Sequence, residues 1–400
     1  MSFLSQNLSK IKPSPTIAVS MKAAELKAQG KDIISLGMGE PDFDTPDNIK
    51  EFAINAIKNG DTKYTAVDGT LALKDAIIAK FQKENNLSYE RKNITVGTGA
   101  KQVLYNTLMA TLNEGDEVII PSPYWVSYPD MVLLAGGTPV IAEGREGNDF
   151  KITSSDLEKT ITDKTKWLIL NSPSNPTGSC YSQAELKSLA EVLIKYPQVN
   201  IISDDIYEHL LFDDCKFSTI VNVEPKLKDR VLLLNGVSKA YAMTGWRIGF
   251  AAGRADLIKA ISKIQSQSTS SPCSISQAAS VEAMIGKKDF IAERSAVFQN
   301  RRNFVVEMLN NITGIECKKP NGAFYVFPSC KGLFGKQTPT GVEIKNCTDF
   351  STYLLEEALV STVPGVAFGA VGFFRISYAA SDELLKKALE RISKVCDLLK

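Results

Sequence analysis

Short apolar runs alternate with helical patterns along most of the chain. The runs that we interpret as strands cover residues 93–99, 116–123, 138–143, 166–173, 199–205, 230–236 and 246–253. Helical periodicity lies between several of them, as in residues 101–112 and 183–195. Apolar strands separated by helices are typical of a parallel sheet that is buried on both faces. The pattern therefore predicts an α/β fold with a mostly parallel seven-stranded sheet between helices.

The pattern changes near residue 290. A long helical pattern over residues 293–310 leads into short strands and a final helix, whereas the chain before residue 46 is mostly irregular. A chain of 400 residues is also longer than one hydrophobic core usually spans. We therefore predict a large domain over residues 47–290 and a smaller α+β domain over residues 291–400, to which the segment 1–46 belongs.

Composition excludes several classes of protein. Hydrophobic residues make up 44% and charged residues 23% of the chain, as in ordinary soluble proteins, and the formal net charge of +1 favours neither nucleic acid nor a membrane surface. No apolar run is long enough to span a membrane, and the N-terminus lacks the apolar core of a signal peptide. Seven scattered cysteines without a CxxC motif indicate reduced thiols and a cytoplasmic location.

The chain contains one histidine, His209. A zinc site with several histidines is therefore impossible, and a Ser-His-Asp or Cys-His arrangement would have to use His209. A partly buried histidine near the surface is the simpler interpretation, and we predict no metal site. If the protein is an enzyme, we expect a group other than histidine to move its protons.

Unusual residues follow five of the predicted strands at the point where each strand ends. These segments are GTGAK (97–101), PSPYW (121–125), NSPSNPTG (171–178), SDDIY (203–207) and NGVSK (235–239). In open parallel sheets, ligands bind beyond the carboxyl ends of the strands. We therefore expect the five segments to meet in one cleft.

Two cations in this region point to a phosphorylated carbonyl compound. Lys239 lies among small residues, and Arg247 follows eight positions later. Both could simply be solvated. A desolvated lysine, however, has a lowered pKa and becomes a nucleophile, and arginine binds phosphate in a bidentate manner. The glycine turn at residues 97–102 also suits a phosphate, because it opens a helix, although a plain strand-to-helix turn explains it equally well.

Four further residues extend this set. Asp204 could be a turn carboxylate or the partner of a cationic ring nitrogen, and Tyr207 could point a phenol to the same place. Trp125 is either an ordinary aromatic at the rim or a surface for ring stacking, and Asn175 could be only a turn residue. A phosphate, a ring nitrogen, a ring oxygen, a flat ring and an aldehyde for Lys239 are all features of pyridoxal 5′-phosphate.

At this point the chain resembles the class I, fold-type I aminotransferases, which use pyridoxal phosphate. The motifs that carry the resemblance are GVSKAYAMTGWRIG (236–249), NPTG (175–178), DDIY (204–207), GEPDFDTP (39–46), YWVSYP (124–129) and FRISYA (374–379). They span nearly the whole chain in the family's order. The chain is most similar to the bacterial one-beta subgroup of aspartate aminotransferases, some of which also use prephenate, and the resemblance implies ping-pong amino-group transfer.

The resemblance also implies roles for the cofactor site. Lys239 would bind the cofactor covalently and then move the substrate proton. The other implied cofactor contacts are Asp204 at the ring nitrogen, Tyr207 and Asn175 at the ring oxygen, Trp125 on the ring face, and Gly99, Ala100, Lys101 and Arg247 at the phosphate. Tyr64 would reach the phosphate of a neighbouring subunit, which implies a homodimer with shared sites. Gly236 stands where many relatives have serine, so we expect Ser238 or water to replace that hydroxyl.

For the substrate, the resemblance implies that Arg375 binds the α-carboxylate. The Gly39 backbone, Asn175 and Trp125 would lie beside it. A second carboxylate, as in aspartate, would bind Lys101, although Lys101 could instead only neutralise the cofactor phosphate. From the N-terminal segment, Ser14 and Thr16 would close over the substrate, and Lys12 resembles a residue linked with prephenate use.

Three other functions share some of these features. A lyase of the same fold, such as a carbon–sulfur lyase, shares the first chemical steps, and another aminotransferase differs only in its substrate. A non-catalytic regulator that senses pyridoxal phosphate would need a DNA-binding domain. The motifs begin within about forty residues of the N-terminus, which leaves no room for one, so we expect an enzyme.

Overall fold

The computed structural model describes residues 3–11 and 15–400. At its centre lies a seven-stranded sheet, with the strand order β2-β8-β7-β6-β5-β3-β4. The strands are β2 (Ile94–Gly97), β3 (Glu117–Ser122), β4 (Thr138–Glu143), β5 (Thr165–Asn171), β6 (Asn200–Asp204), β7 (Val231–Gly236) and β8 (Gly249–Ala252). Only β8 runs in the direction opposite to the other six strands, so the predicted mostly parallel seven-stranded sheet is confirmed.

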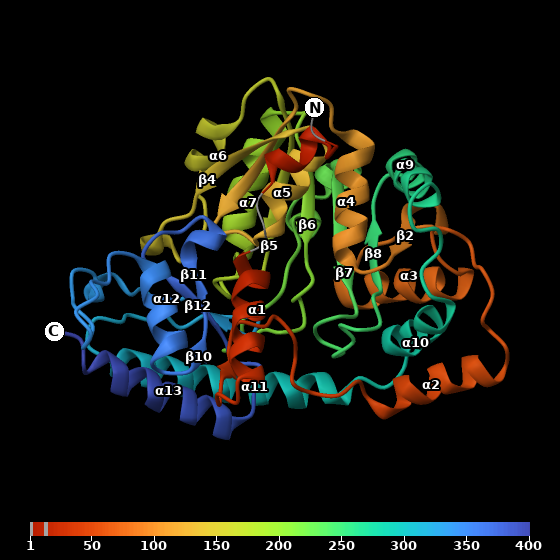
Figure 1. Cartoon of the computed structure of the whole chain (residues 1–400). Helices are drawn as coiled ribbons and strands as arrows, with labels where there is room; N and C mark the ends of the chain where they lie inside the picture. Colours follow the sequence, from red (N-terminus) through yellow and green to blue (C-terminus); the bar gives the residue numbers. More distant parts are fainter. Residues whose placement is uncertain (1–2, 12–14) are drawn as a thin grey trace.

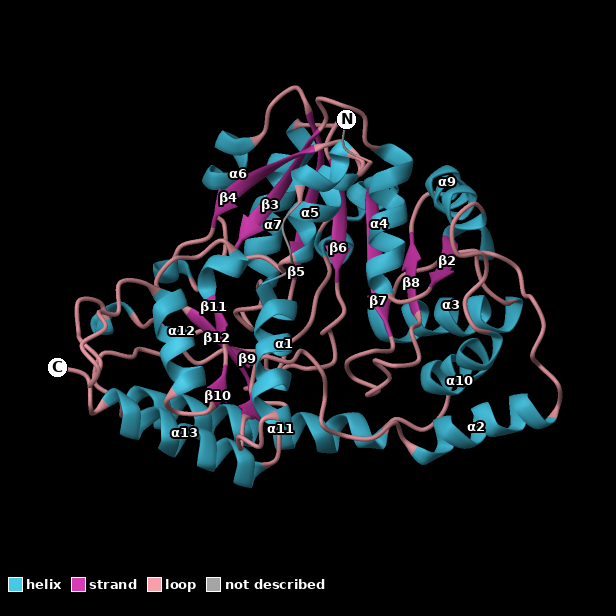
Figure 2. Cartoon of the chain, in the orientation of Figure 1, coloured by secondary structure: helices cyan, strands magenta, loops and turns pink. Residues whose placement is uncertain are grey.

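Both faces of the sheet are buried because alternate side chains of each strand enter different apolar clusters. In β5, Trp167 and Ile169 face one cluster, whereas Leu168 and Leu170 face the other. The first cluster is covered by α4 (Ala100–Thr111), α5 (Ser127–Leu134) and α9 (Ala255–Ser266). The second is covered by α2 (Asp47–Lys58), α3 (Leu71–Asn85), α6 (Ser154–Thr160), α7 (Gln183–Lys195), α8 (Ile220–Val223) and α10 (Ser274–Ile285). Period-two strands between helices produce this three-layer arrangement (Figures 1 and 2).

The ends of the helices follow from local sequence signals. Helix α7 begins after Ser182, where the backbone N–H of Glu185 donates to Ser182 Oγ at 3.3 Å and the Ser182 N–H donates to the Glu185 carboxylate at 2.7 Å. This reciprocal capping satisfies two N–H groups that have no partner within the helix. Helix α3 ends at Asn86, whose left-handed conformation terminates a helix. These signals explain why α7 covers the predicted residues 183–195.

The chain from residue 289 onward supplies most of a third apolar cluster, beside the large sheet. Its helices are α11 (Asp289–Asn310), α12 (Cys347–Glu356) and α13 (Asp382–Cys396), and its antiparallel sheet is β11 (Val363–Pro364), β12 (Phe374–Ser377) and β9 (Tyr325–Val326). The N-terminal helix α1 (Pro15–Ala28) precedes β1 (Ile34–Ser35), which pairs in parallel with β10 (Val360–Ser361). The N-terminal segment therefore packs beside the C-terminal part (Figure 1). The two predicted boundaries, after residues 46 and 290, stay a prediction.

Short 3₁₀ helices complete the architecture. They cover Gln6–Lys10, Arg91–Asn93, Glu146–Asn148, Pro225–Arg230, Lys331–Leu333 and Gly365–Phe368. None of the helices in residues 3–11 and 15–400 combines the length and the apolar character that crossing a bilayer requires.

Candidate active site

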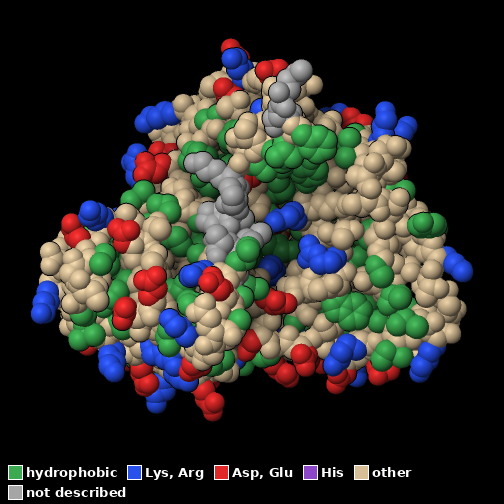
Figure 3. Space-filling model, in the orientation of Figure 1, with side chains coloured by type: hydrophobic (Ala, Val, Ile, Leu, Met, Phe, Trp, Pro, Cys, Tyr) green, Lys and Arg blue, Asp and Glu red, His purple; other side chains and the backbone are tan. Residues whose placement is uncertain are grey.

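A cavity of about 400 Å³ lies at the carboxyl ends of the parallel strands. All five segments expected at this edge contribute to its lining, which includes Ala100, Lys101, Trp125, Asn175, Asp204, Tyr207, Ser238, Lys239 and Arg247. Gly39 and Arg375 complete it from the N-terminal and C-terminal parts of the chain. Figure 3 shows a hollow near the centre of this face, with Lys and Arg side chains at its border. The convergence that the sequence predicted is therefore confirmed.

Lys239 follows β7 by three residues and points its amine into the cavity. Its Nζ donates a hydrogen bond to the Gly39 carbonyl at 2.6 Å. Burial, and then the positive charge of Arg375, lower the pKa of Lys239 to about 8, although Glu40 and Asp204 act in the opposite direction. An appreciable fraction of this amine is therefore unprotonated near neutral pH, which a nucleophile or a base requires.

Asp204 ends β6 and is buried. Tyr128, on α5, donates its hydroxyl to Asp204 Oδ2 at 2.6 Å, whereas Oδ1 has no hydrogen-bond partner among the described residues. Burial raises the pKa of Asp204 to about 6, even though the bond from Tyr128 acts to lower it. A buried carboxylate oxygen without a donor is costly, so this site is complete only when a ligand supplies an N–H. Tyr128 was not among the predicted residues, although it lies one helical turn after Trp125 in YWVSYP.

Arg375 lies in β12 and is 3% exposed. Its Nη1 donates to Asn175 Oδ1 at 2.7 Å and its Nη2 to the Gly37 carbonyl at 2.6 Å, while Nε has no partner in the part of the chain that the structure describes. Burial lowers the pKa of Arg375, and within residues 3–11 and 15–400 no carboxylate forms an ion pair with it. A buried guanidinium without an acidic partner is suited to bind the carboxylate of a ligand.

Tyr325, in β9, connects these groups and was not predicted. Its hydroxyl lies 2.9 Å from the Tyr207 hydroxyl, and the Arg375 guanidinium lies 4.6 Å from its ring centre. A Cβ atom at Gly39 would approach the Tyr325 hydroxyl to 2.6 Å, so position 39 requires glycine. The sequence indicated for Tyr325 only that it lies in the strand GAFYVFP. Its contact with Tyr207 could not be predicted, because it joins residues far apart in the chain.

The turn between β2 and α4 is suited to hold a phosphate. Gly99 has φ +84°, and a Cβ atom there would collide with the Arg247 guanidinium. The N-terminus of α4 therefore lies open beside Arg247, whose Nη1 donates to the Thr244 carbonyl at 2.9 Å. Ser238 lines the same cavity, whereas Gly236 does not. A Cβ atom at Gly236 would lie 3.0 Å from the Ile248 carbonyl, so a serine there would have little room.

Lys101 lies in the first turn of α4. Its ammonium lies 4.7 Å from the centre of the Trp125 ring, and the Trp125 and Tyr128 rings meet edge to face at 5.3 Å. Partial desolvation and the charge of Arg247 lower the pKa of Lys101. Among the residues that the structure describes, lysine and arginine side chains line the cavity at four positions, and the acidic ones there are Glu40 and Asp204. This excess of positive charge favours a ligand that carries several negative charges.

Two of the predicted residues that the structure describes, Gly99 and Tyr64, do not line this cavity, although Gly99 directly precedes the lining residue Ala100. Tyr64 is 96% exposed and does not line it, so its predicted role at a neighbouring subunit stays a prediction. Lys12 and Ser14 lie outside the described residues. Thr16 lies in α1, but its side chain is not described. The roles predicted for these residues are therefore untested.

The cavity fits pyridoxal phosphate by three independent features. The free oxygen of Asp204 is an acceptor that a protonated ring nitrogen would satisfy, and the glycine turn with Arg247 leaves room that would suit a phosphate. Lys239 provides an amine of lowered pKa in the same cavity. Together with the seven-stranded sheet, this arrangement defines a fold-type I transferase.

Comparison with known proteins agrees with this class. The family profile described as "Aminotransferase class I and II" matches residues 31–392. The chain is 59% identical to the "Probable aspartate/prephenate aminotransferase" of Rickettsia bellii over the full length of both, and 59% identical to the "Aspartate/prephenate aminotransferase" of Cereibacter sphaeroides over 99% of both. The chain belongs to the class I and II aminotransferase family.

Solved structures are similar over the whole chain. The aspartate aminotransferase of Rhizobium meliloti superimposes with a TM-score of 0.98, at 53% identity and with 100% of both chains covered. The enzyme of Thermus thermophilus with maleate has a TM-score of 0.92, at 40% identity, covering 99% of this chain and 100% of the other.

Proposed function

We propose that this protein is a pyridoxal-phosphate-dependent aspartate aminotransferase. It would transfer the amino group between L-aspartate and 2-oxoglutarate, giving oxaloacetate and L-glutamate, in a ping-pong cycle. The observation that carries this proposal is the buried Arg375, which forms no ion pair with a carboxylate of the described residues and lies in the same cavity as the Lys239 amine of lowered pKa. The names of the relatives support the substrate, and the maleate bound to the Thermus thermophilus enzyme is also a dicarboxylate.

Different residues of this chain would hold different parts of the cofactor. Asp204 would face its ring nitrogen, Tyr207 and Asn175 its ring oxygen, and Trp125 one ring face. The amides of Gly99, Ala100 and Lys101, with Arg247 and Ser238, would hold its phosphate. When bound, pyridoxal phosphate supplies an aldehyde for the substrate amine and a ring that accepts electrons from the substrate α-carbon.

The chain's own groups bind the substrate and move its proton. Arg375 binds the α-carboxylate in a bidentate manner, with Asn175 holding the guanidinium in place. Lys239 Nζ removes the proton from the α-carbon of the amino acid and, in the second half-reaction, delivers a proton to the α-carbon of the oxo acid, since its lowered pKa makes it a base near neutral pH. Lys101 provides a second positive charge for the distal carboxylate.

Spectra of the two half-reactions test the proposal directly. The loaded protein is mixed with one amino acid at a time, and the cofactor absorbance is followed without an oxo acid. L-aspartate and L-glutamate are expected to convert the cofactor fully, and 2-oxoglutarate and oxaloacetate to reverse the change. Conversion only by other amino acids would point to another aminotransferase. Release of ammonia together with an oxo acid would instead indicate a lyase.

A second acceptor, prephenate, is favoured by the printed names of the relatives from Rickettsia bellii and Cereibacter sphaeroides. The proposal is that prephenate also accepts the amino group and yields arogenate. The measurement is the return of the aminated cofactor to its original spectrum when prephenate is added. No return at millimolar prephenate would restrict the enzyme to the dicarboxylic oxo acids.

The pH dependence of cofactor attachment follows from the lowered pKa of Lys239. Only the unprotonated amine attacks an aldehyde, so below the pKa the rate rises about tenfold per pH unit. In the cofactor-free protein we expect the attachment rate to rise up to about pH 8 and then level off. Rapid mixing with pyridoxal phosphate from about pH 6 to pH 10 measures this. A rise that continues to about pH 10 would show an ordinary lysine pKa.

Substrate specificity separates the two roles considered for Lys101. If Lys101 binds the distal carboxylate, Lys101→Ser is expected to lower kcat/KM for aspartate and glutamate by about 10–100-fold, the value of a lost charged hydrogen bond. Alanine, which lacks this carboxylate, should lose less than about threefold and serves as the matched control. Equal losses for all amino acids, with weaker cofactor binding, would show that Lys101 serves only the phosphate.

We also propose a cytoplasmic homodimer with shared sites. All seven cysteines are free, as in a reducing compartment, and the exposed Tyr64 is available to a second subunit. Mixing Tyr64→Phe subunits with Lys239→Ala subunits creates hybrid dimers in which one of the two sites carries neither change. Activity should then approach about a quarter of the wild-type value, above that of either variant. Sedimentation of an active monomer at assay concentration would contradict the shared site.

A further inference from the structure

A buried polar cluster lies next to the cavity but does not line it. We call Lys80, Asn85, Glu208 and Asn235 the Glu208 cluster. These residues come from α3, the turn after β6 and the end of β7, and each is less than 9% exposed, with Lys80 at 2%. Charged residues are almost never buried to this extent unless they are paired. The binding and proton-transfer roles described above use none of the four.

Glu208 accepts hydrogen bonds from three sides. Asn235 Nδ2 donates to its Oε1 at 2.6 Å, Asn85 Nδ2 donates to its Oε2 at 3.0 Å, and the Lys80 ammonium forms an ion pair with Oε1. The orientation of both amides is determined by their other partners. Asn85 Oδ1 accepts from Lys80 at 2.7 Å, and Asn235 Oδ1 accepts from the Gly236 N–H at 2.7 Å. Glu208 therefore faces only donors, which requires its ionised form.

The charge state agrees with this geometry. Burial acts to raise the pKa of Glu208, but the charges of Lys80 and His209 and the hydrogen bonds from Asn85 and Lys80 hold this pKa below its usual value. The neighbouring Asp205 is also buried, and burial, together with the negative charges of Glu208 and Asp204, raises its pKa well above its usual value. Glu208 is therefore the carboxylate that Lys80 neutralises.

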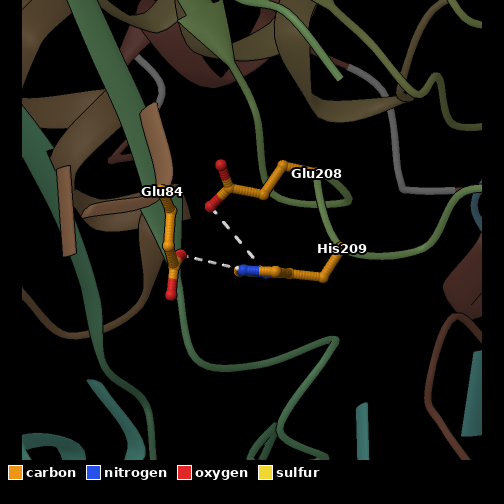
Figure 4. Close-up of side chains that lie close together, drawn as sticks. All are labelled: Glu84, Glu208 and His209. Atoms are coloured by element: carbon orange, nitrogen blue, oxygen red, sulfur yellow. Dashed lines mark hydrogen bonds and ion pairs between the residues drawn. The ribbon is translucent and has the colours of Figure 1, made fainter. Parts of the chain in front are cut away.

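The outer side of the cluster does not form a metal site. Figure 4 shows Glu84, Glu208 and His209, whose ligand atoms lie within 4.8 Å of one another. However, the Lys80 ammonium pairs with Glu208 and lies 3.7 Å from Glu84, and Lys288 Nζ lies 2.5 Å from Glu84. Two ammonium groups thus balance two carboxylates, and a bound cation would have to displace them.

The Glu208 cluster joins the two chain segments that deliver the central groups of the site. Glu208 follows Tyr207 directly and lies four residues after Asp204. Its partner Asn235 lies four residues before Lys239. The side-chain oxygen of Asn235, Oδ1, accepts a hydrogen bond from the Gly236 N–H. A backbone bond from the Asp205 N–H to the Leu234 carbonyl at 2.9 Å joins the same two segments. Displacement of Glu208 would therefore shift both segments relative to each other.

We propose that Glu208 is a positioning residue. Glu208 is joined to Tyr207 by a peptide bond and to Asn235 by a hydrogen bond. It thereby fixes the position of the Asp204–Tyr207 turn relative to the segment that leads to Lys239, and Lys80 is the counter-ion that keeps Glu208 charged. For its effect on turnover, this inference rests on the proposed function. Small displacements of reacting groups reduce turnover strongly, because the proton transfer depends on their mutual distance.

The test compares Glu208→Gln with a matched control, Glu84→Gln. Glutamine has nearly the same size as glutamate. Its NH₂ group, however, would replace one of the two Glu208 oxygens and would face a hydrogen-bond donor instead of an acceptor. We expect Glu208→Gln to lower kcat by about 10–100-fold, with a smaller change in KM, because misplacement affects the chemical step more than the carboxylate contacts. Glu84→Gln, which removes a carboxylate that contacts neither asparagine, should stay within about twofold.

A second pair of variants separates positioning from stability. Lys80→Met leaves Glu208 buried without its counter-ion and should lower the melting temperature, whereas the double variant Lys80→Met/Glu208→Gln removes both charges and should recover most of it. Positioning predicts that kcat of the double variant nevertheless stays low. A kcat that returns together with the melting temperature would show a purely stabilising role and overturn the proposal.

Hydrogen exchange of the cofactor-free protein provides a readout that is independent of turnover. In Glu208→Gln, we expect faster exchange in residues 203–210 and 233–240 and unchanged exchange in β3. Unchanged exchange in both segments, with kcat within about twofold of wild type, would overturn the proposal. If the wild-type protein does not transaminate aspartate but exchange rises in these segments, the proposed function fails while the positioning role stands.

Discussion

Replacement of Lys239 by alanine is expected to lower kcat by at least about 10⁴-fold, the upper end of what a single proton-transfer group contributes. The variant loses the amine that would attach the cofactor and the base that would remove the substrate α-proton. Lys101, the other lysine among the described residues that line the cavity, lies over the Trp125 ring rather than at the Gly39 carbonyl. The fold should survive, since alanine fits where the longer side chain stood.

Turnover of aspartate with 2-oxoglutarate measures this loss, and Lys259→Ala, on the exposed surface of α9, is the control for removal of a lysine. Borohydride reduction of the loaded wild-type protein, followed by peptide mapping, identifies the lysine that holds the cofactor. A label on any lysine other than Lys239, or a variant with more than about 1% of wild-type kcat, would contradict the assignment.

Replacement of Asp204 by asparagine is expected to lower kcat by about 10²–10³-fold, which corresponds to the several kcal/mol lost when one partner of a buried charge pair is removed. Asparagine keeps the size of the side chain and can still accept the Tyr128 hydroxyl, but it carries no negative charge for a protonated ring nitrogen. Cofactor binding should weaken less than kcat, since Arg247 and the turn before α4 would still hold the phosphate.

The exchange rate of the substrate α-proton with solvent measures the step that depends on this charge. Asp205→Asn is a matched control, because Asp205 is the next residue and is also buried, but does not line the cavity. We expect this control to stay within a few-fold of wild type. Near-normal α-proton exchange in Asp204→Asn would show that this carboxylate is not needed to keep the ring nitrogen protonated.

The sequence predicted the elements of the large sheet well. All seven strands lie within the predicted runs, apart from one residue at the start of β5, because apolar runs buried on both faces carry a strong local signal. It also placed Lys239, Asp204, Trp125 and Asn175 at one edge of this sheet, since residues that follow parallel strands must emerge on the same side. The antiparallel direction of β8 was not predicted, because periodicity carries no information on strand direction.

The sequence by itself thus determined the class of fold, the edge of the sheet where ligands bind and the identity of the cationic and acidic groups there. These properties depend on local periodicity and chain order. Only the tertiary structure decided that Tyr128 holds one oxygen of Asp204, that Tyr325 meets Tyr207, and that Lys80 neutralises Glu208. These contacts join residues 76, 118 and 128 positions apart, and their partners are selected by packing and by the cost of leaving a buried polar group unpaired.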